Sequence, residues 1–187
     1  MPEPTWPPAT IKLLILDVDG TMTDGAMYFS ADGQVLKRFH VHDGLGIVRL
    51  QKAGVEVALI SGDGSPIVRA RAEMLGIRAA VIGCEDKAEV VRRLMAEREL
   101  SPEQVLYMGD DVNDLCAFGE VGHTAAPANA VEEVKQAAGH ITTRRGGQKV
   151  PTRFLPSARS TPVLPPTAAS TMARRVVGTA TQSTPRR

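Results

Sequence analysis

The sequence lacks the features that mark membrane proteins, secreted disulfide-rich proteins and proteins that bind single-stranded nucleic acid. No apolar run approaches the roughly 18 residues of a membrane span, and the longest, at 11–16 and 55–60, have the length of a strand. The chain has only 2 cysteines, and aromatic residues make up 4% of it. Its first ten residues contain no signal-peptide core. We therefore expect a cytoplasmic protein that binds neither a membrane nor nucleic acid.

Charge and composition divide the chain into unlike parts. Residues 1–133 contain 12 Lys and Arg and all 21 Asp and Glu, whereas residues 134–187 contain the other 10 basic residues and no acid. The end of the chain is also rich in Pro, Ser and Thr and has no periodicity, which favours a disordered, solvated extension. We predict a flexible N-terminus at 1–10, one folded domain at 11–147 and a disordered basic tail at 148–187.

Between residues 11 and 142, short apolar runs alternate with helical patterns. The runs are continuous rather than alternating, as in parallel strands that helices cover on both faces. We expect strands at 12–16, 55–60, 79–82 and 105–108. A β-hairpin over 27–39, with Asp32-Gly33 at its turn, precedes a helix that we expect Asp43 to cap. The pattern predicts an α/β fold with a Rossmann-like parallel sheet flanked by helices and a β-hairpin inserted after the first strand.

Two acids, Asp17 and Asp19, follow the first predicted strand directly. In an open parallel sheet, ligands bind beyond the carboxyl ends of the strands. Two carboxylates one residue apart can divide the work there: one attacks phosphorus to form an aspartyl-phosphate, and the other carries a proton to the leaving oxygen. A pair of turn aspartates that cap the following loop would give the same pattern.

Polar groups also follow the next two predicted strands. Ser61-Gly62 can offer a hydroxyl and a backbone N–H to a phosphoryl group, although a helix-entry turn explains this pair equally well. Lys87 begins a predicted helix, where the helix dipole disfavours a cation unless an anion lies nearby. A solvated surface lysine is the alternative.

An acidic cluster follows the fourth predicted strand and contains Asp110, Asp111 and Asp114. Carboxylates this close repel one another unless a cation lies among them. Carboxylate oxygens are ligands that suit Mg²⁺. The cluster therefore predicts a magnesium site.

In this order, residues 17–21, Ser61, Lys87 and 109–114 resemble the four motifs of the haloacid dehalogenase superfamily. The resemblance implies a phosphatase in which Asp17 is the nucleophile and Asp19 the general acid/base. It implies that Ser61, Gly62 and Lys87 bind phosphate. It further implies that Mg²⁺ is bound by Asp17, the Asp19 backbone carbonyl and Asp110, with support from Asp111 and Asp114.

The short spacing between Ser61 and Lys87, 26 residues, leaves no room for the cap domain that many members of this superfamily carry. The hairpin, together with the segment 39–47 that follows it, looks similar to that of the capless 3-deoxy-D-manno-octulosonate 8-phosphate phosphatases. This resemblance implies Mg²⁺-dependent hydrolysis of a small acidic sugar phosphate in lipopolysaccharide sugar biosynthesis. It also implies a homotetramer formed through the hairpin at 26–39.

Two features depart from that family and keep alternatives open. Asp63 stands where the octulosonate phosphatases carry Arg, and relatives that hydrolyse nonulosonate 9-phosphates carry an acid there. Asp63 is therefore a candidate substrate-side residue, and a nonulosonate 9-phosphate is an alternative substrate. The tail from residue 148 lacks the family's amphipathic helix. From other functional classes, an inactive scaffold and a phosphoacceptor module are the alternatives, although the motif order differs from that of phosphoacceptor domains.

Overall fold

The computed structural model describes Pro8 and residues 10–148. The predicted disordered tail lies outside these residues except for Gln148, and the predicted flexible N-terminus lies outside them except for Pro8 and Thr10. Within the described part, no helix combines the length and the hydropathy needed to cross a bilayer.

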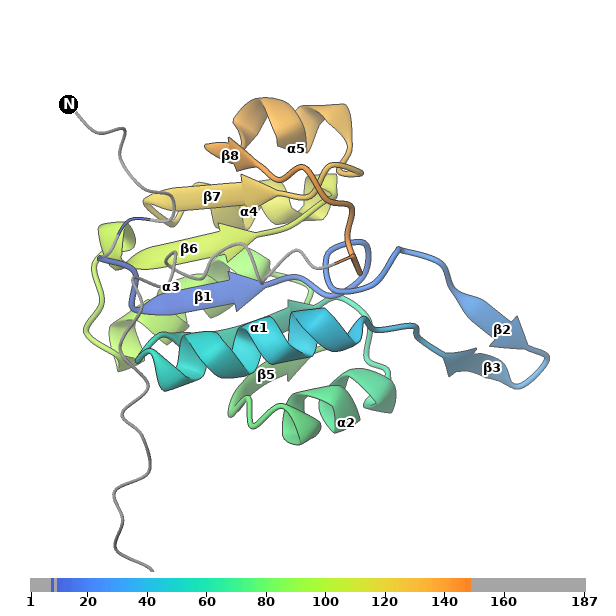
Figure 1. The fold of residues 1–187 in the computed structure, drawn as a ribbon. Coiled ribbons are helices and arrows are strands. Elements are labelled where there is room, and N and C mark those ends of the chain that lie inside the picture. The colour runs from blue at the N-terminus through green and yellow to red at the C-terminus, as the bar shows by residue number, and fades with distance from the viewer. Residues whose placement is uncertain (1–7, 9, 149–187) are drawn as a thin grey trace, which may run out of the picture. The chain divides into compact units, whose positions relative to one another are not determined.

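A six-stranded parallel sheet forms the centre of the described chain (Figure 1). Its strands are β1 (Leu13–Leu16), β4 (Glu56–Ser61), β5 (Ala79–Ile82), β6 (Val105–Met108), β7 (His123–Ala126) and β8 (His140–Ile141). Their order in space is β5-β4-β1-β6-β7-β8, which places β1 inside the sheet. The predicted parallel α/β fold is confirmed, and the structure adds β7 and β8, which the apolar pattern does not reveal.

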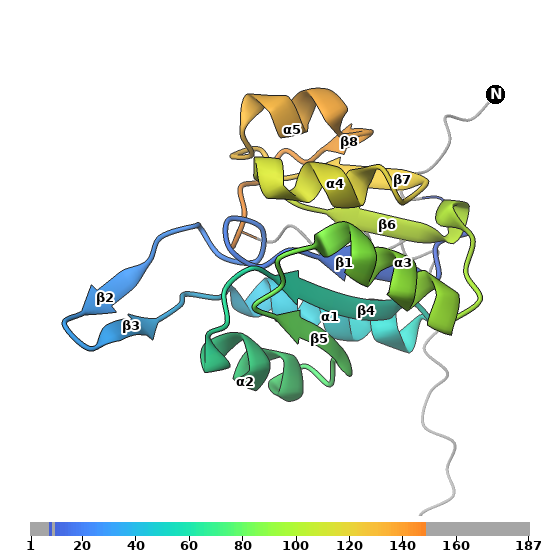
Figure 2. The same cartoon turned by 180° about the vertical axis from the view of Figure 1, so that it is seen from behind.

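Helices cover both faces of this sheet (Figures 1 and 2). They are α1 (Val41–Lys52), α2 (Pro66–Met74), α3 (Lys87–Glu97), α4 (Leu115–Phe118) and α5 (Glu132–Ala137). One core contains Ile47 of α1 and Val68 of α2, and the other contains Val91 of α3. Because successive strand side chains point to opposite faces, β1 contributes Leu14 to the first core and Ile15 to the second. Both faces of β1 are thereby buried, so the loop that follows it starts from a rigid strand.

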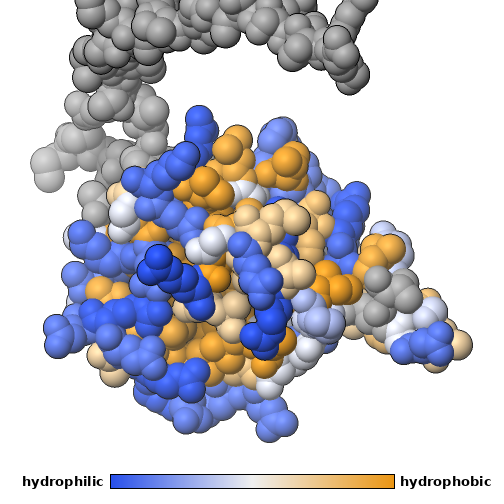
Figure 3. Space-filling model, turned by 90° about the horizontal axis from the view of Figure 1, so that it is seen from below, coloured by the Kyte–Doolittle hydropathy of each residue, from blue (hydrophilic) through white to orange (hydrophobic). Residues whose placement is uncertain are grey.

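Two short strands stand apart from the main sheet: β2 (Tyr28–Ser30) pairs antiparallel with β3 (Gly33–Leu36). Gly33, with a φ of 119°, provides a turn conformation that side chains disfavour. The hairpin projects beyond the carboxyl ends of the sheet strands in Figure 1, and Figure 3 shows it standing clear of the domain surface. Met27 and Phe29 are 56% and 63% exposed, so the hairpin carries large apolar side chains into solvent.

Helix α1 begins at Val41, and its N-cap is His40, whose Nδ1 accepts a hydrogen bond of 3.1 Å from the backbone N–H of His42. Asp43 lies within the first turn and is buried, so the prediction that Asp43 caps this helix is wrong. Arg71 of α2 also contacts the start of this helix, because it donates a hydrogen bond of 3.4 Å to the His40 carbonyl oxygen.

Candidate active site

The polar residues singled out in the sequence follow or end strands β1, β4, β5 and β6. In the sheet, β1 lies between β4 and β6, so loops from neighbouring strands meet at one edge. In parallel sheets, such a place opens a ligand crevice beyond the strand ends. A hydrogen bond of 2.9 Å from the Asp17 N–H to the Met108 carbonyl oxygen holds the start of the β1 loop against β6.

Lys87, the first residue of α3, joins the acid after β1 to the acids after β6. Its Nζ lies 2.7 Å from Asp17 Oδ1 and 2.7 Å from Asp114 Oδ1, and all three side chains are buried. Burial lowers the pKa of Lys87, but attraction to the two carboxylates outweighs it and the pKa is raised. Lys87 therefore remains charged, and the anion expected near this helix start is provided by the protein's own carboxylates.

Both side-chain oxygens of Asp114 accept hydrogen bonds from other groups of the protein. Its Oδ1 accepts hydrogen bonds from Lys87 Nζ and from the hydroxyl of Tyr107, at 2.7 and 2.8 Å. Its Oδ2 accepts the backbone N–H groups of Asp110 and Asp111, at 3.0 and 3.2 Å. Gly109 is required beside it, because a Cβ there would lie 2.2 Å from Asp114 Cγ. Asp114 thus shapes the loop after β6 and orients Lys87.

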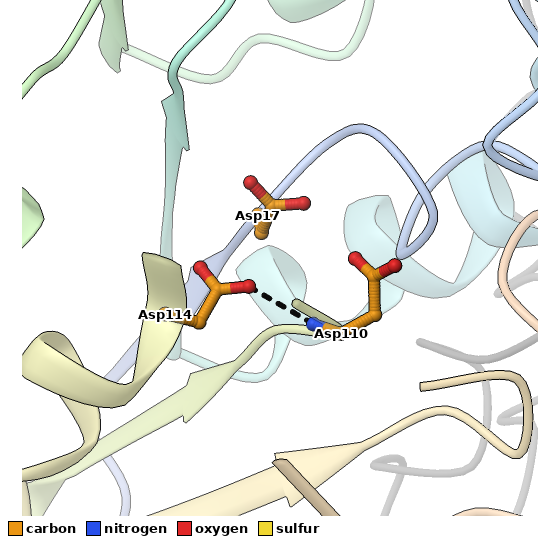
Figure 4. A group of neighbouring side chains, drawn as sticks. All are labelled: Asp17, Asp110 and Asp114. Atoms are coloured by element: carbon orange, nitrogen blue, oxygen red, sulfur yellow. Dashed lines mark hydrogen bonds between the residues drawn. The ribbon is translucent and has the colours of Figure 1, made fainter. Parts of the chain in front are cut away.

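The donor set for a metal ion comes from the same carboxylates. Asp17, Asp110 and Asp114 each offer an oxygen within 4.8 Å of the others, and Figure 4 shows Asp114 bonded to the backbone of Asp110. Burial and repulsion from Asp114 raise the pKa of Asp17. Burial and repulsion from the neighbouring acids together raise the pKa of Asp110 to about 6, although a hydrogen bond from Thr21 lowers it. A divalent cation would relieve both carboxylates, so the residues fit Mg²⁺.

Because Asp114 already accepts four hydrogen bonds, Asp17 and Asp110 are the carboxylates best able to bind that cation. The Thr21 hydroxyl donates a hydrogen bond of 3.1 Å to Asp110 Oδ1 and orients this side chain. Gly20 permits the approach of Asp110, because a Cβ on it would lie 1.9 Å from Asp110 Oδ2. The loop after β1 is thus fitted closely to the loop after β6.

A second cluster joins Asp19 and Asp63 through Lys37, which follows β3. Lys37 Nζ lies 2.5 Å from Asp19 Oδ1 and 2.7 Å from Asp63 Oδ2. Asp63 is fixed in turn: its N–H donates to Ser61 Oγ at 3.2 Å, and its Oδ1 accepts the N–H of Ser65 at 2.9 Å. The structure therefore brings Asp63 to the general acid/base candidate, with a cation between them.

The remaining predicted residues, Ser61, Gly62 and Asp111, form no ion pair in the two clusters described above. Ser61 ends β4 and is buried, and Gly62 directly after it is exposed. Asp111 is exposed, and its side chain accepts the N–H of Val112 at 2.7 Å, so it caps the short turn that leads to Asp114. The exposed backbone at the end of β4, next to β1 in the sheet, is therefore that of Gly62.

The end of the described chain folds onto the loop after β1. Asn129 bridges the two: its Nδ2 donates to the Gly20 carbonyl oxygen at 3.0 Å, and its Oδ1 accepts the Gly146 N–H at 2.5 Å. The Gly147 N–H donates to the Thr21 carbonyl oxygen at 3.1 Å. A Cβ on Gly146 would lie 1.7 Å from the Gly20 oxygen, so glycine is required for this contact.

The comparisons with known proteins bear on the family to which this chain belongs. Residues 85–146 match the family model described as haloacid dehalogenase-like hydrolase. A 3-deoxy-D-manno-octulosonate 8-phosphate phosphatase from Haemophilus influenzae is 43% identical over 138 residues, which are 74% of this chain and 77% of that protein. This chain belongs to the 3-deoxy-D-manno-octulosonate 8-phosphate phosphatase family. The resemblance drawn from the motifs is thereby confirmed.

Solved structures of the family share the fold. The cobalt-bound Haemophilus influenzae enzyme is 41% identical and covers 78% of this chain and 85% of its own, with a TM-score of 0.75. The enzyme from Moraxella catarrhalis, solved with a magnesium ion, a phosphate ion and a KDO molecule, is 35% identical with a TM-score of 0.73, and the match covers 77% of this chain and 82% of that one. Relatives therefore carry divalent cations on the same fold.

Sequence reasoning missed four residues that hold the site together: Thr21, Lys37, Tyr107 and Asn129. Thr21 belongs to the first motif, and a hydroxyl beside two acids is a signal that could have drawn attention to it. Tyr107 is an aromatic hydroxyl within an otherwise apolar strand, which predicts a buried hydrogen-bond partner. Lys37 and Asn129 carry no comparable local signal, because each acts on a loop distant in sequence, 18 and 109 residues away.

Proposed function

We propose that this chain is a cytoplasmic, Mg²⁺-dependent phosphatase that hydrolyses 3-deoxy-D-manno-octulosonate 8-phosphate to the free sugar acid and phosphate. The observation that carries the proposal is the buried Lys87, whose Nζ lies 2.7 Å from Asp17 Oδ1, while Asp17 and Asp110 lie close enough to share a cation. The chain is also 43% identical to a relative named for that activity. The product would enter lipopolysaccharide sugar synthesis.

In the first step, Asp17 attacks phosphorus with the oxygen that Lys87 does not hold. Lys87 binds Oδ1, which leaves Oδ2 as the attacking atom. The bond between phosphorus and the sugar oxygen breaks, and the leaving oxygen takes a proton from Asp19. An aspartyl-phosphate on Asp17 and the free sugar acid result. Ser61 and the Gly62 backbone N–H bind the phosphoryl oxygens during transfer.

In the second step, Asp19 reverses its role. Its carboxylate takes a proton from a water molecule, and the water oxygen attacks the phosphorus of the aspartyl-phosphate. Phosphate leaves and Asp17 is regenerated as a carboxylate. Because the leaving sugar oxygen is a strong base, this reaction needs an acid in the first step, and Asp19, two residues after Asp17 with a side chain that is 33% exposed, can supply the proton.

Asp17, Asp110 and the backbone carbonyl of Asp19 would bind Mg²⁺, which when bound supplies positive charge for the phosphoryl oxygens. Lys87 contributes a second, permanent positive charge from the protein side. Asp114 and Asp111 have supporting roles, since Asp114 orients Lys87 and Asp111 caps the turn that leads to Asp114.

The octulosonate is preferred over a nonulosonate 9-phosphate because matched relatives at 37–43% identity bear the octulosonate name. Asp63 does not oppose this choice. Its Oδ2 pairs with Lys37 and its Oδ1 accepts the Ser65 N–H, so its charge is compensated and its oxygens are engaged. A nonulosonate phosphate remains the alternative substrate for the test below.

The assembly that would accompany this activity is a homotetramer formed through the hairpin at 26–39. Support comes from its surface, where Met27, Phe29 and Leu36 are all more than 40% exposed. Apolar side chains gathered on one projecting element favour association. With no cap domain between Ser61 and Lys87, a neighbouring subunit would also help to enclose a small substrate.

The decisive experiment measures phosphate release from the octulosonate phosphate, a nonulosonate 9-phosphate and hexose phosphates, each with and without Mg²⁺. We expect metal-dependent turnover that favours the octulosonate phosphate. Asp17→Asn is the matched control, because it keeps the shape of the side chain but removes the nucleophile. Turnover that favours the nonulosonate would select the alternative substrate, and a folded chain without turnover on any substrate would contradict the proposal.

A further inference from the structure

Lys37 occupies a place that the two chemical steps above do not use. Its side chain is only 1% exposed, whereas the side chains of its partners Asp19 and Asp63 are 33% and 29% exposed. The ammonium group is therefore closed off from solvent, whereas both acids keep part of their side chain open to it. Because its side chain is almost fully buried, Lys37 is not placed to contact a substrate from solvent, but it can act through Asp19.

The contact distinguishes the two oxygens of Asp19. Lys37 Nζ donates to Oδ1. In the described part of the chain, no hydrogen bond reaches Oδ2. An ammonium group has donors only, so Oδ1 serves as an acceptor and Oδ2 is left for a reacting group. Without Lys37 the carboxyl group could rotate and present either oxygen, or neither, to the phosphoryl group.

Lys37 is itself held from several sides. Asp63, its second partner, is fixed by hydrogen bonds involving Ser61 and Ser65. Phe39, two residues further, packs against the core beneath Arg71, whose guanidinium lies 5.3 Å from the ring centre. Burial lowers the pKa of Lys37, but its hydrogen bonds to the two acids outweigh burial and raise the pKa. The cation is thus both charged and fixed in position.

We propose that Lys37 is a positioning residue that orients the carboxyl group of Asp19, so that Oδ2 exchanges the proton with the leaving sugar oxygen and then with water. The inference rests on the proposed phosphatase function. It separates the two halves of the chemistry, because attack by Asp17 on phosphorus does not need Lys37, whereas proton delivery to a basic leaving group does.

The test compares two leaving groups. The sugar alkoxide requires a proton as it departs, whereas 4-nitrophenolate is weakly basic and departs without one. We expect Lys37→Met to lower kcat for the octulosonate phosphate about 50-fold while KM stays within about threefold of wild type. Release of 4-nitrophenolate in a single turnover, with enzyme in excess over 4-nitrophenyl phosphate, should stay within about threefold. Lys37→Arg, which keeps a charged donor, should recover most of the lost kcat.

Arg38→Met is the matched control, because Arg38 is the exposed neighbouring cation and pairs with Asp24 at 2.9 Å. It should leave both reactions unchanged, and thermal unfolding should show that all variants are folded. Three results would overturn the role of Lys37 but not the proposed function. Lys37→Met could lose both reactions equally, Arg38→Met could lose as much activity as Lys37→Met, or kcat of Lys37→Met for the octulosonate phosphate could equal that of the wild type. A wild-type chain inactive in both reactions would instead overturn the proposed function, and this inference with it.

Discussion

Lys87 and Asp114 form an ion pair of 2.7 Å in which neither side chain is more than 3% exposed. The same ammonium group binds Asp17 at 2.7 Å, so one buried cation balances two buried acids that come from different ends of the domain sequence. Removing one member of such a cluster leaves charge without compensation in a region poor in water. Stability and the orientation of the nucleophile therefore depend on the same side chain.

The first prediction concerns Lys87→Met. We expect this change to lower the free energy of unfolding by about 3 to 5 kcal/mol and to lower phosphate release at least about 100-fold. Urea unfolding and phosphate release measure the two effects. Arg92→Met is the control, because Arg92 forms an exposed pair of 2.6 Å with Glu120 and should cost at most about 1 kcal/mol. Equal costs for the two variants would show that the buried cluster is not important to stability.

A second prediction follows from Asp110, whose pKa is raised to about 6. A carboxyl with a raised pKa binds its proton more tightly in the folded state than in the unfolded state. Without metal, its contribution to stability is therefore largest at low pH and is lost as the pH rises through about 6. Mg²⁺ needs the ionised form, so the increase in Tm that Mg²⁺ causes should grow between about pH 5 and about pH 8. Calorimetry would measure this, and Asp110→Asn should remove most of the effect. A Mg²⁺ effect that does not change with pH would contradict this assignment.

The contact between the end of the described chain and the β1 loop gives a third prediction. A Cβ on Gly146 would lie 1.7 Å from the Gly20 oxygen, so Gly146→Ala should displace the loop that carries Asp17 and Asp19. We expect phosphate release to fall at least about tenfold, since small displacements of reacting groups are costly. Gly139→Ala is the control, because the nearest atom to its Cβ would lie at an ordinary 3.5 Å. Similar activities for both variants would show that the contact does not position the loop.

The fourth prediction concerns the hairpin. Phe29 is 63% exposed at its surface, and Phe29→Ser should shift the protein from tetramers toward smaller species. Sedimentation at several protein concentrations measures this shift. Met74, which is 76% exposed on α2, offers a control, because Met74→Ser removes a similar apolar side chain outside the hairpin. A wild-type monomer, or equal effects from both variants, would contradict assembly through the hairpin.

Much of the architecture could be predicted because the signals are local. Continuous apolar runs such as Leu13–Leu16 mark buried parallel strands, and all four side chains of that strand are buried. Strand β8 escaped prediction because it has only 2 residues, and β7 escaped because it lacks a run of large apolar side chains. Residues such as Ala125 and His140 adopt the strand form by pairing with each other across these two strands. The start of α1 escaped as well, because the His40 imidazole caps the helix and Asp43 lies buried inside its first turn.

The sequence by itself determined the order of the acids, the hydroxyl and the lysine, and the rule that parallel strands end at one edge was enough to bring Asp17, Lys87 and Asp110 together. Only the tertiary structure decided how each group is held. It places Lys37 between Asp19 and Asp63, and it places Asn129 between Gly20 and Gly146. These contacts join segments with no shared periodicity, up to 109 residues apart. Their existence depends on angstrom-scale packing of side chains, which residue order alone does not contain.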